Sequence, residues 1–378
     1  MRNRFFWPFI PILFLVVAGV GIQLFLSDGG AAGIRQGGIA VVGVVLAIWL
    51  SRLEGKRAWV VATIVGALSF LGLLAVFALP AVRGVHSWIR LGPLSIQPSE
   101  IAKVGLIFVL ALLFGAQQGR GFGPLAGGAW AFLVSGVVIL LVAIQPDLGT
   151  AIVMAGTTWV QFLASRVPKV LTAGIPLLCV GILFALGPRI VPIVKPLLKP
   201  HQIERVENFF AQEKDEKGAN WQIRQAHLQM GAGGWTGSGF RSDVRHELEW
   251  LPEQENDFVF AVVGRTTGFV GSLVVILLFM WAVLSTLAEG STLSEGGARH
   301  MLWGLASYLG VHSVLNIAVV LALVPATGFP LVPLSLGGSS VVGLSLLVGI
   351  AAAGLHRGGV NYNPRIDSQG DRPKRALQ

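Results

Sequence analysis

Long apolar runs separated by short polar segments are the dominant pattern along this chain. Most of these runs approach the roughly 20 residues that an α-helix needs to cross a bilayer. Inside lipid a helix satisfies its own backbone hydrogen bonds, so the pattern predicts an all-α polytopic membrane protein. We expect about ten transmembrane helices, at residues 6–26, 36–51, 58–79, 100–117, 125–144, 149–165, 169–187, 258–288, 301–324 and 337–356.

The connections between these runs predict the domain organisation. Residues 145–148 are all that separates the fifth run from the short sixth run, so this pair forms either two spans or a re-entrant hairpin. A large polar loop at about 188–256 lies between helices 7 and 8. We expect a single membrane domain over residues 1–357. The polar, basic tail at 358–378 shows no apolar period and is expected to be disordered.

Composition agrees with the membrane class. Hydrophobic residues make up 53% of the chain, charged residues 12%, and the mean hydropathy is +0.71. Soluble domains carry about 25% charged residues. The single cysteine excludes a disulfide framework or a cysteine-based metal site. The first run is too long for a secretory signal and no cleavage site follows it, so we interpret it as an uncleaved span.

Basic residues predict the orientation. With the N-terminus inside, the cytoplasmic segments hold fourteen Lys and Arg residues, whereas the short opposite loops hold only Arg35, Arg83 and Arg90. The positive-inside rule then places both termini in the cytoplasm and the large loop outside. This bias and the basic tail account for most of the net charge of +9, so nucleic-acid binding is not expected.

Asp257 is the most informative polar residue, because it lies where the large loop re-enters the apolar region. Ionisable groups at membrane depth are costly and are usually functional. A carboxylate there could meet a substrate with a polar head and a lipid tail. The alternative is that Asp257 caps the helix that follows.

Two further clusters are predicted on the outward side. Ser99 is a candidate N-cap, and Glu100 and Lys103 share a helical face, either as a self-neutralising pair or with the lysine available to an anionic head group such as a diphosphate. Asp147 lies at the top of the fifth and sixth runs, where capping is again the alternative.

The polar loops add weaker indications. Residues 221–227 predict a short amphipathic helix, and the glycine-rich run at 231–240 could cradle phosphate through its amides, although it lacks a P-loop ending. Prolines and glycines between 325 and 340 imply irregular backbone, which is tolerated at membrane depth only when buried or lining a cavity. The histidines show no paired metal-ligand spacing, so a histidine metal centre is not expected. No Walker motif or Rossmann fingerprint is present, so coupling to a nucleotide is not expected.

Four separated motifs resemble the SEDS family of bacterial shape, elongation, division and sporulation proteins, closer to RodA than to FtsW. They are Trp88-Ile89-Arg90-Leu91-Gly92 with Gln97-Pro98-Ser99-Glu100, Gln145-Pro146-Asp147-Leu148-Gly149-Thr150, Leu251-Pro252-Glu253 to Asp257-Phe258, and Asn316 with Pro325 to Ser340.

The resemblance implies a peptidoglycan glycosyltransferase in the bacterial cytoplasmic membrane that polymerises lipid II, an undecaprenyl-diphosphate-linked disaccharide pentapeptide. It also implies a class B penicillin-binding protein as partner. The family's essential aspartate falls on Asp257, and attack by a sugar hydroxyl needs such a carboxylate as general base. No cofactor is required by the pattern, although a divalent cation (Mg or Mn) could assist basic side chains in stabilising the diphosphate. Candidate substrate-binding residues are Arg90, Gln97, Ser99, Glu100, Lys103, Asp147, Trp221, Gln222, Glu253, Thr327, Ser339 and Ser340.

Two departures from the family pattern stand out. Glutamates usual after the aspartate are replaced around Arg265, which on a continuous helix would lie about 12 Å deeper and be rotated by about 80° from Asp257. Leu336 stands where the family usually has tyrosine. Alternatives to the polymerase are a lipid II flippase, which would not need Asp257 as a base, and a non-catalytic scaffold that activates the penicillin-binding protein. The RodA-like length and the lack of a long N-terminal extension favour a role in elongation rather than division.

Overall fold

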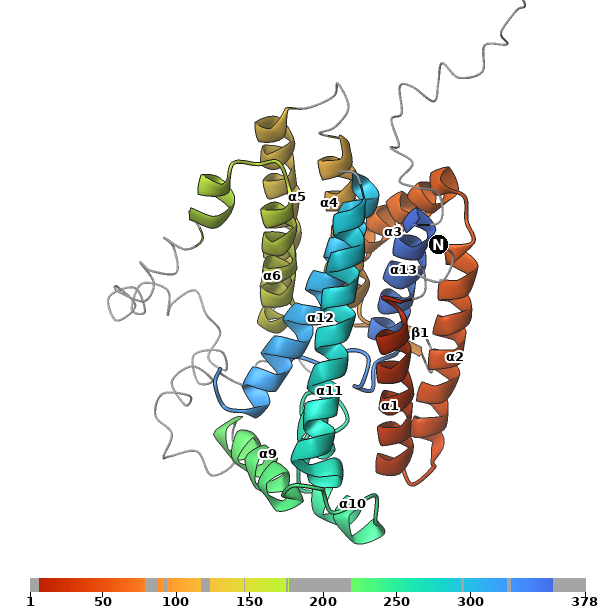
Figure 1. The fold of residues 1–378 in the computed structure, drawn as a ribbon, viewed down its shortest axis with the longest axis vertical. Helices are drawn as coiled ribbons and strands as arrows, with labels where there is room; N and C mark the ends of the chain where they lie inside the picture. Colours follow the sequence, from red (N-terminus) through yellow and green to blue (C-terminus); the bar gives the residue numbers. More distant parts are fainter. Residues whose placement is uncertain are drawn as a thin grey trace, which may run out of the picture.

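The computed structural model describes residues 7–78, 88–91, 94–116, 123–145, 147–174, 176, 219–293, 296–324 and 328–355. These residues form a helical bundle, as predicted (Figure 1). The first half contains α1 (Ile10–Leu26), α2 (Ala31–Ser51), α3 (Gly55–Ala75), α4 (Pro98–Ala116), α5 (Pro124–Ile144) and α6 (Leu148–Ala164). The second half contains α9 (Ala219–Gly233), α10 (Ser242–Leu248), α11 (Val259–Thr292), α12 (Gly297–Val320) and α13 (Gly338–Leu355).

Short elements complete the described part of the chain. A 3-10 turn (η1, Val76–Ala78) extends α3, and a π-helical turn (η2) covers Val170–Gly174. Strands β1 (Ile89–Leu91) and β2 (Leu94–Ile96) pair antiparallel just before α4. This hairpin is a small exception to the predicted all-α architecture.

Nine of the ten predicted spans correspond to helices among the described residues. Seven are long and apolar enough to cross a membrane, and α1 and α6 are apolar helices of 17 residues. The seventh predicted span lies mostly outside the described residues, as does the predicted tail. α5 and α6 run side by side, and the 21 residues of α5 extend about 30 Å, which favours two spans over a re-entrant hairpin (Figure 1).

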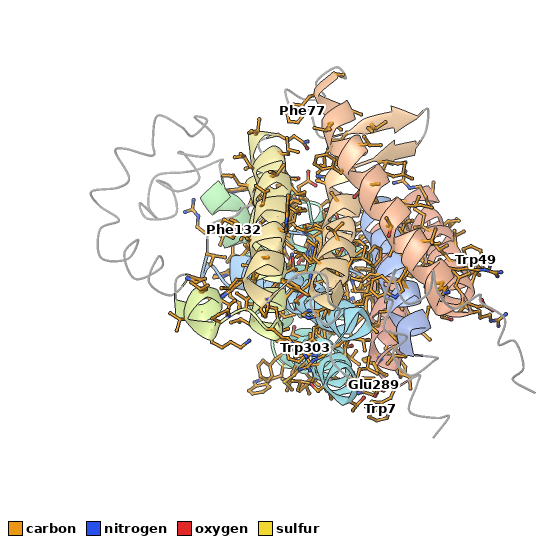
Figure 2. All side chains as sticks on the ribbon, turned by 90° about the horizontal axis from the view of Figure 1, so that it is seen from above. Trp7, Trp49, Phe77, Phe132, Glu289 and Trp303 are labelled. Atoms are coloured by element: carbon orange, nitrogen blue, oxygen red, sulfur yellow. The ribbon has the colours of Figure 1, made fainter. Side chains whose placement is uncertain are left out.

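The bundle has a buried centre and a lipid-facing periphery. α4 lies at the centre, with 72% of its span buried, whereas α2 at the edge has 22% buried. Figure 2 shows Trp49 and Phe132 on the outside of the bundle, where they are 57% and 72% exposed. Apolar side chains on an outer surface of this extent are expected to face lipid.

α11 is not one continuous helix. Gly268 has φ 67° and ψ −163°, which divides α11 into segments 259–267 and 269–292. The glycine-rich segment after α9 replaces the hydrogen bonds that this break removes. The amides of Ser238 and Gly239 donate to the carbonyl groups of Arg265 and Thr266, at 3.0 and 2.9 Å. In return, the amides of Phe269 and Val270 donate to Gly234 and Trp235 carbonyl groups at 2.9 and 3.1 Å. The break is therefore built into the fold, with its backbone groups paired.

This arrangement changes the interpretation of the glycine-rich run. The predicted amphipathic helix is present as α9, but the amides of the following glycine-rich segment are used within the protein. Gly237 also donates its amide to Gly233 at 2.8 Å. The amides of Gly237, Ser238 and Gly239 are therefore not available to a phosphate.

Candidate functional site

A polar cavity of about 430 Å³ lies at the end of the bundle where α2, α4, α6, α11 and α13 begin. These helices come from distant parts of the sequence, so the cavity is assembled only by the fold. Seven of the predicted site residues line it: Gln97, Glu100, Asp147, Glu253, Asp257, Ser339 and Ser340.

Asp257 is positioned by a tight turn in front of α11. The carbonyl of Glu253 accepts hydrogen bonds from the amides of Asn256, Asp257 and Phe258, at 3.0, 3.0 and 3.2 Å. Glu253 itself has φ 52°, a left-handed conformation that is uncommon for a non-glycine residue and often marks functional sites. The N-cap of α11 is Phe258, one residue after Asp257.

Asn316 of α12 fixes the same turn from the other side. Its side-chain amide donates to the backbone carbonyl of Asp257 at 2.7 Å and also to the carbonyl of Phe329. Gly328 lies beside the carboxylate, because a Cβ built on this glycine would be 3.4 Å from Oδ2 of Asp257. The turn, α12 and the loop before α13 therefore hold Asp257 at the cavity wall.

The irregular loop before α13 is anchored by side chains from several helices. The Ser335 hydroxyl donates to the Asn256 carbonyl at 2.6 Å, and the Leu336 amide donates to the Glu255 carbonyl at 2.8 Å. Gln36 donates through its amide to the Ser335 carbonyl at 3.2 Å. The irregular backbone predicted here thus lines the cavity and is paired, as membrane depth requires.

Asp147 has a different role from Asp257. It is the N-cap of α6, and Oδ1 accepts from the Thr150 amide at 3.1 Å. Oδ2 accepts from the Gln97 side-chain amide at 2.9 Å and from the Ser99 hydroxyl at 3.2 Å. Capping is confirmed for Asp147, and both of its oxygens bind protein donors that join α6 to the start of α4.

Ser99 was predicted as the N-cap of α4, and this was wrong. α4 already includes Pro98, and the Ser99 hydroxyl is directed to Asp147 because the two helices begin next to each other. The Ser339 hydroxyl accepts a hydrogen bond from the Gln97 backbone amide at 3.2 Å, which joins α13 to the start of α4.

Glu100 and Lys103 form the self-neutralising pair. Lys103 Nζ lies 2.8 Å from Glu100 Oε1 and 3.1 Å from His312 Nε2, and the lysine side chain is 1% exposed. Glu100 lines the cavity, whereas Lys103 lies behind it, next to the Tyr308 ring at 5.8 Å. Burial of both charges without pairing would be strongly unfavourable, so the pair is the expected state.

The remaining predicted site residues are not brought into the described lining. Trp221 and Gln222 lie on α9, which packs against α11. Arg90 is on β1, opposite Ser95, with its backbone alone described, and Thr327 lies outside the described residues.

Sequence reasoning missed Arg35 as a site residue. It had placed Arg35 in a loop, but α2 begins at Ala31, so the arginine is in the first turns of that helix and lines the cavity. Of the basic residues whose side chains are described, it is the one that reaches this lining, and it forms no ion pair within the described part of the chain. Arg35 thus faces a cavity that also contains Glu100, Asp147, Glu253 and Asp257. The available signal was the adjacent Gln36, a second polar residue at the start of an apolar run.

Arg265 does not extend this site. Its guanidinium forms an ion pair with Glu247 and donates to the Ser238 hydroxyl at 2.8 Å and the Ala232 carbonyl at 3.0 Å. It therefore fastens the α9–α10 segment to the break in α11. Within the described residues, no group of three His, Cys, Asp or Glu side chains is arranged to hold a metal ion.

Fold and cavity together define an integral membrane protein with a carboxylate-rich site at one end of its bundle. The FtsW/RodA/SpoVE family, described as cell cycle proteins, matches residues 5–357. The chain belongs to this family, the SEDS family of peptidoglycan glycosyltransferases, and is a glycosyltransferase.

Named relatives and solved structures agree with this assignment. The probable peptidoglycan glycosyltransferase FtsW of Trichlorobacter lovleyi is 31% identical, over 85% of this chain and 81% of the relative. The peptidoglycan glycosyltransferase MrdB of Escherichia coli K12 is 32% identical, over 74% of this chain and 73% of the relative. A chain in a peptidoglycan synthase complex that coordinates polymerization and crosslinking has 29% identity and a TM-score of 0.69, covering 91% of this chain and 96% of that one. Thermus thermophilus RodA, at 24% identity and a TM-score of 0.64, covers 93% of this chain and 96% of its own and shares the fold.

Proposed function

We propose that this glycosyltransferase polymerises lipid II into glycan strands, with Asp257 as the general base. The observation that carries the proposal is the placement of Asp257. Asp257 lines the cavity, its backbone is held by Asn316 and by the Glu253 turn, and the N-cap of α11 is Phe258.

The chemical step follows from these positions. Asp257 accepts the proton of the acceptor sugar hydroxyl, whose oxygen forms a bond to the anomeric carbon of the donor. The bond from that carbon to the lipid diphosphate breaks, and the diphosphate leaves with the electron pair. A diphosphate is a good leaving group, so no second carboxylic acid is needed to protonate it, in contrast to glycoside hydrolysis.

Negative charge that develops on the diphosphate requires a cation. Arg35 is the candidate that the cavity supports best, because it lines the cavity and arginine binds phosphate oxygens bidentately. Lys103 is less accessible, since it is enclosed and paired with Glu100. Arg90 remains a prediction, as does the assistance of Mg or Mn.

We further propose that both termini are cytoplasmic and that the cavity opens on the outer face of the membrane, as the basic residues predict. A class B penicillin-binding protein is the proposed partner, in line with the synthase complex that one structural relative forms. The role in elongation stays a prediction, because FtsW and MrdB relatives match with similar identity. The elongation role would be supported if this chain restored rod shape, but not division, in cells depleted of their own members of the family.

The direct test compares wild type, Asp257→Asn and Asp243→Asn, each as the full chain with its penicillin-binding partner. Asp243 is an exposed acid on α10, with its side chain 57% exposed, and serves as the matched control. Glycan strands are measured from purified lipid II, and transport is measured in parallel in vesicles. We expect wild type and Asp243→Asn to polymerise and Asp257→Asn to make no strands while remaining folded.

The alternatives give different results. Equal polymerisation by Asp257→Asn would remove this residue from the mechanism. Transport of lipid II by wild type without any glycan product would instead favour the flippase.

A further inference from the structure

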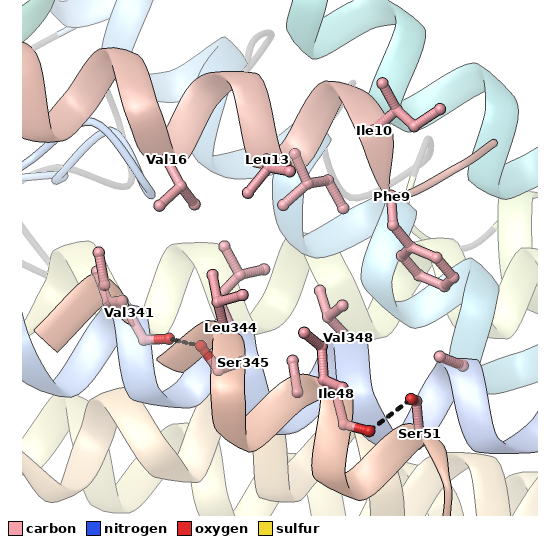
Figure 3. A pocket seen from close by; sticks show the side chains of 15 residues that line it. Phe9, Ile10, Leu13, Val16, Ile48, Ser51, Val341, Leu344, Ser345 and Val348 are labelled. Carbon is pink, nitrogen blue, oxygen red and sulfur yellow. Dashed lines mark hydrogen bonds between the residues drawn. The ribbon is translucent and has the colours of Figure 1, made fainter. Parts of the chain in front are cut away.

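An apolar groove of about 250 Å³ lies between α1, α2 and α13, away from the polar cavity (Figure 3). Figure 3 shows Leu13 and Val16 of α1 pointing toward Val341 and Leu344 of α13 across the groove. The hydroxyl groups in the lining are satisfied locally. Ser345 donates to the Val341 carbonyl at 2.8 Å. Ser51, at the end of α2, donates to the Ile48 carbonyl in its own helix. The hydroxyl hydrogens in the groove are therefore already used, and its otherwise apolar lining fits a hydrocarbon chain.

The floor of the groove is tightly packed. A Cβ on Gly43 of α2 would lie 2.5 Å from Ser345 Oγ, and a Cβ on Gly349 of α13 would lie 2.7 Å from Leu50 Cβ. These glycines bring α2 and α13 into close contact beneath the groove. α1 is held elsewhere, because a Cβ on Gly19 would be 2.7 Å from the Pro333 carbonyl oxygen. The groove is thus a feature of the helix arrangement and not loose packing between α2 and α13.

Along two helices, consecutive residues line the polar cavity and the groove. On α2, Ile39 lines the cavity and Ala40 lines the groove. On α13, Ser340 lines the cavity and Val341 lines the groove. From Val341 the lining extends to Ala352, a distance of about 17 Å along a helix. The change from polar to apolar lining therefore falls at the same level on α2 and on α13.

The long edge of the groove is open to the membrane. Leu13 and Ile48 contribute to its lining yet remain 51% and 48% exposed. A chain could enter sideways from the bilayer while its diphosphate stays at the depth of Arg35, in the first turns of α2. The charge and the apolar lining thus follow one another along α2 in the order found in a lipid diphosphate.

We propose that this groove binds the part of the substrate's polyprenyl chain nearest the diphosphate. The inference rests on the proposed function, which supplies a substrate with that chain. The binding free energy of the polyprenyl chain would come from close van der Waals contact with the groove, because the chain is already in an apolar solvent before it binds. The rest of a long tail would remain in the bilayer.

The kinetic test fills the groove from α2. Val44 lines it, whereas the neighbouring Val45 is 60% exposed on the lipid-facing side, so Val44→Trp and Val45→Trp form a matched pair. Each variant, as the full chain with its partner, is assayed with lipid II and with an analogue whose diphosphate carries a methyl group in place of the polyprenyl chain. We expect Val44→Trp to raise KM for lipid II about tenfold, the equivalent of about ten lost carbon–carbon contacts, with KM for the analogue unchanged. Val45→Trp should change neither value.

Two kinetic outcomes would overturn the proposal. One is an equal KM for Val44→Trp and Val45→Trp. The other is an equal rise in KM with both substrates, which would place the disturbance in the cavity and not in tail binding.

A labelling experiment on the unsubstituted groove covers the case in which Val44→Trp does not fold. Lipid II carrying a photoreactive diazirine in its first isoprene units is crosslinked to wild type and to Asp257→Asn, and the labelled peptides are mapped. We expect labels within residues 10–16, 40–51 and 341–352 that excess unlabelled lipid II displaces. Labels on other helices, or equal labelling by a diazirine phospholipid that lipid II does not displace, would refute the groove.

The same experiment separates the two proposals. Displaceable groove labelling in a protein that makes no glycan would contradict the polymerase but leave the groove assignment standing. Polymerisation accompanied by labelling outside the groove would support the polymerase and contradict the groove assignment.

Discussion

Replacement of Asn316 by leucine tests whether the cavity aspartate is held in place by α12. Asn316 is fully buried and donates to the carbonyl groups of Asp257 and Phe329. Leucine has a similar size but no donor. The change therefore removes two hydrogen bonds without opening a large cavity, and both carbonyl groups lose their Asn316 donor.

The expected size of the effect can be worked from these two bonds. An unpaired buried polar group costs about 1–3 kcal/mol, which gives an upper range of about 2–6 kcal/mol for the pair. The Asp257 carbonyl lies next to the cavity and can turn toward water, so we expect a loss of stability of about 2 kcal/mol. That movement displaces Asp257, and a shift of about 1 Å in a catalytic group can lower the rate about 100-fold.

The assay is polymerisation of lipid II by the full chain with its partner, with thermal unfolding in detergent measured alongside. We expect kcat to fall about 100-fold with KM nearly unchanged, because the change affects the base more than the substrate contacts. Val314→Ala, at a 66% exposed position of the same helix, is the control and should behave as wild type. If Asn316→Leu kept kcat within about twofold of wild type, the positioning role of Asn316 would be wrong.

Two further predictions concern the backbone around the site. Gly268→Ala should destabilise the protein by more than about 2 kcal/mol, because φ is 67° at this residue and the added Cβ would lie 2.3 Å from a backbone nitrogen. Thermal unfolding in detergent measures the loss of stability. The control is Gly21→Ala, which should not destabilise the protein because an added Cβ there would have no atom within 4 Å. Asp147→Ala should cost about 0.5–2 kcal/mol as a lost N-cap and should also release Gln97 and Ser99. Asp147→Asn, which keeps one acceptor oxygen, should unfold at a temperature between those of Asp147→Ala and wild type, and equal unfolding of all three would contradict the capping role.

The sequence predicted the helices well because lipid leaves few alternatives to a helix for an apolar run. α6 begins at Leu148 and α11 at Val259, each within one residue of the predicted start. Among the described helices the start of α2 differs most from the prediction, since this helix begins at Ala31 and not at 36. A hydropathy window stops at Arg35 and Gln36, but in the fold these residues face a polar cavity and can lie within the helix. Hydropathy alone cannot distinguish a polar residue in a loop from one that faces a cavity.

The two aspartates show a similar limit at the level of the site. Asp147 and Asp257 both precede a helix, and their positions in the sequence alone did not separate capping from chemistry. Their roles differ by a single position, because Asp147 is itself the N-cap whereas Phe258 holds that place after Asp257. Helix ends are set by a balance of local contacts that is finer than sequence patterns can resolve.

The break in α11 explains why the departure at Arg265 does not weaken the family assignment. On an uninterrupted helix, this arginine would be an unpaired cation deep in the membrane, which is unfavourable. Because Gly268 ends the first segment, Arg265 instead lies in its last turn, beside the glycine-rich loop, where it pairs with Glu247 and donates to Ser238. The partners come from a segment about 20–30 residues earlier in the chain, so no periodicity within the apolar run could indicate them. Arg265 thus stabilises the packing of the α9–α10 segment against α11. It takes no part in the cavity that Asp257 lines.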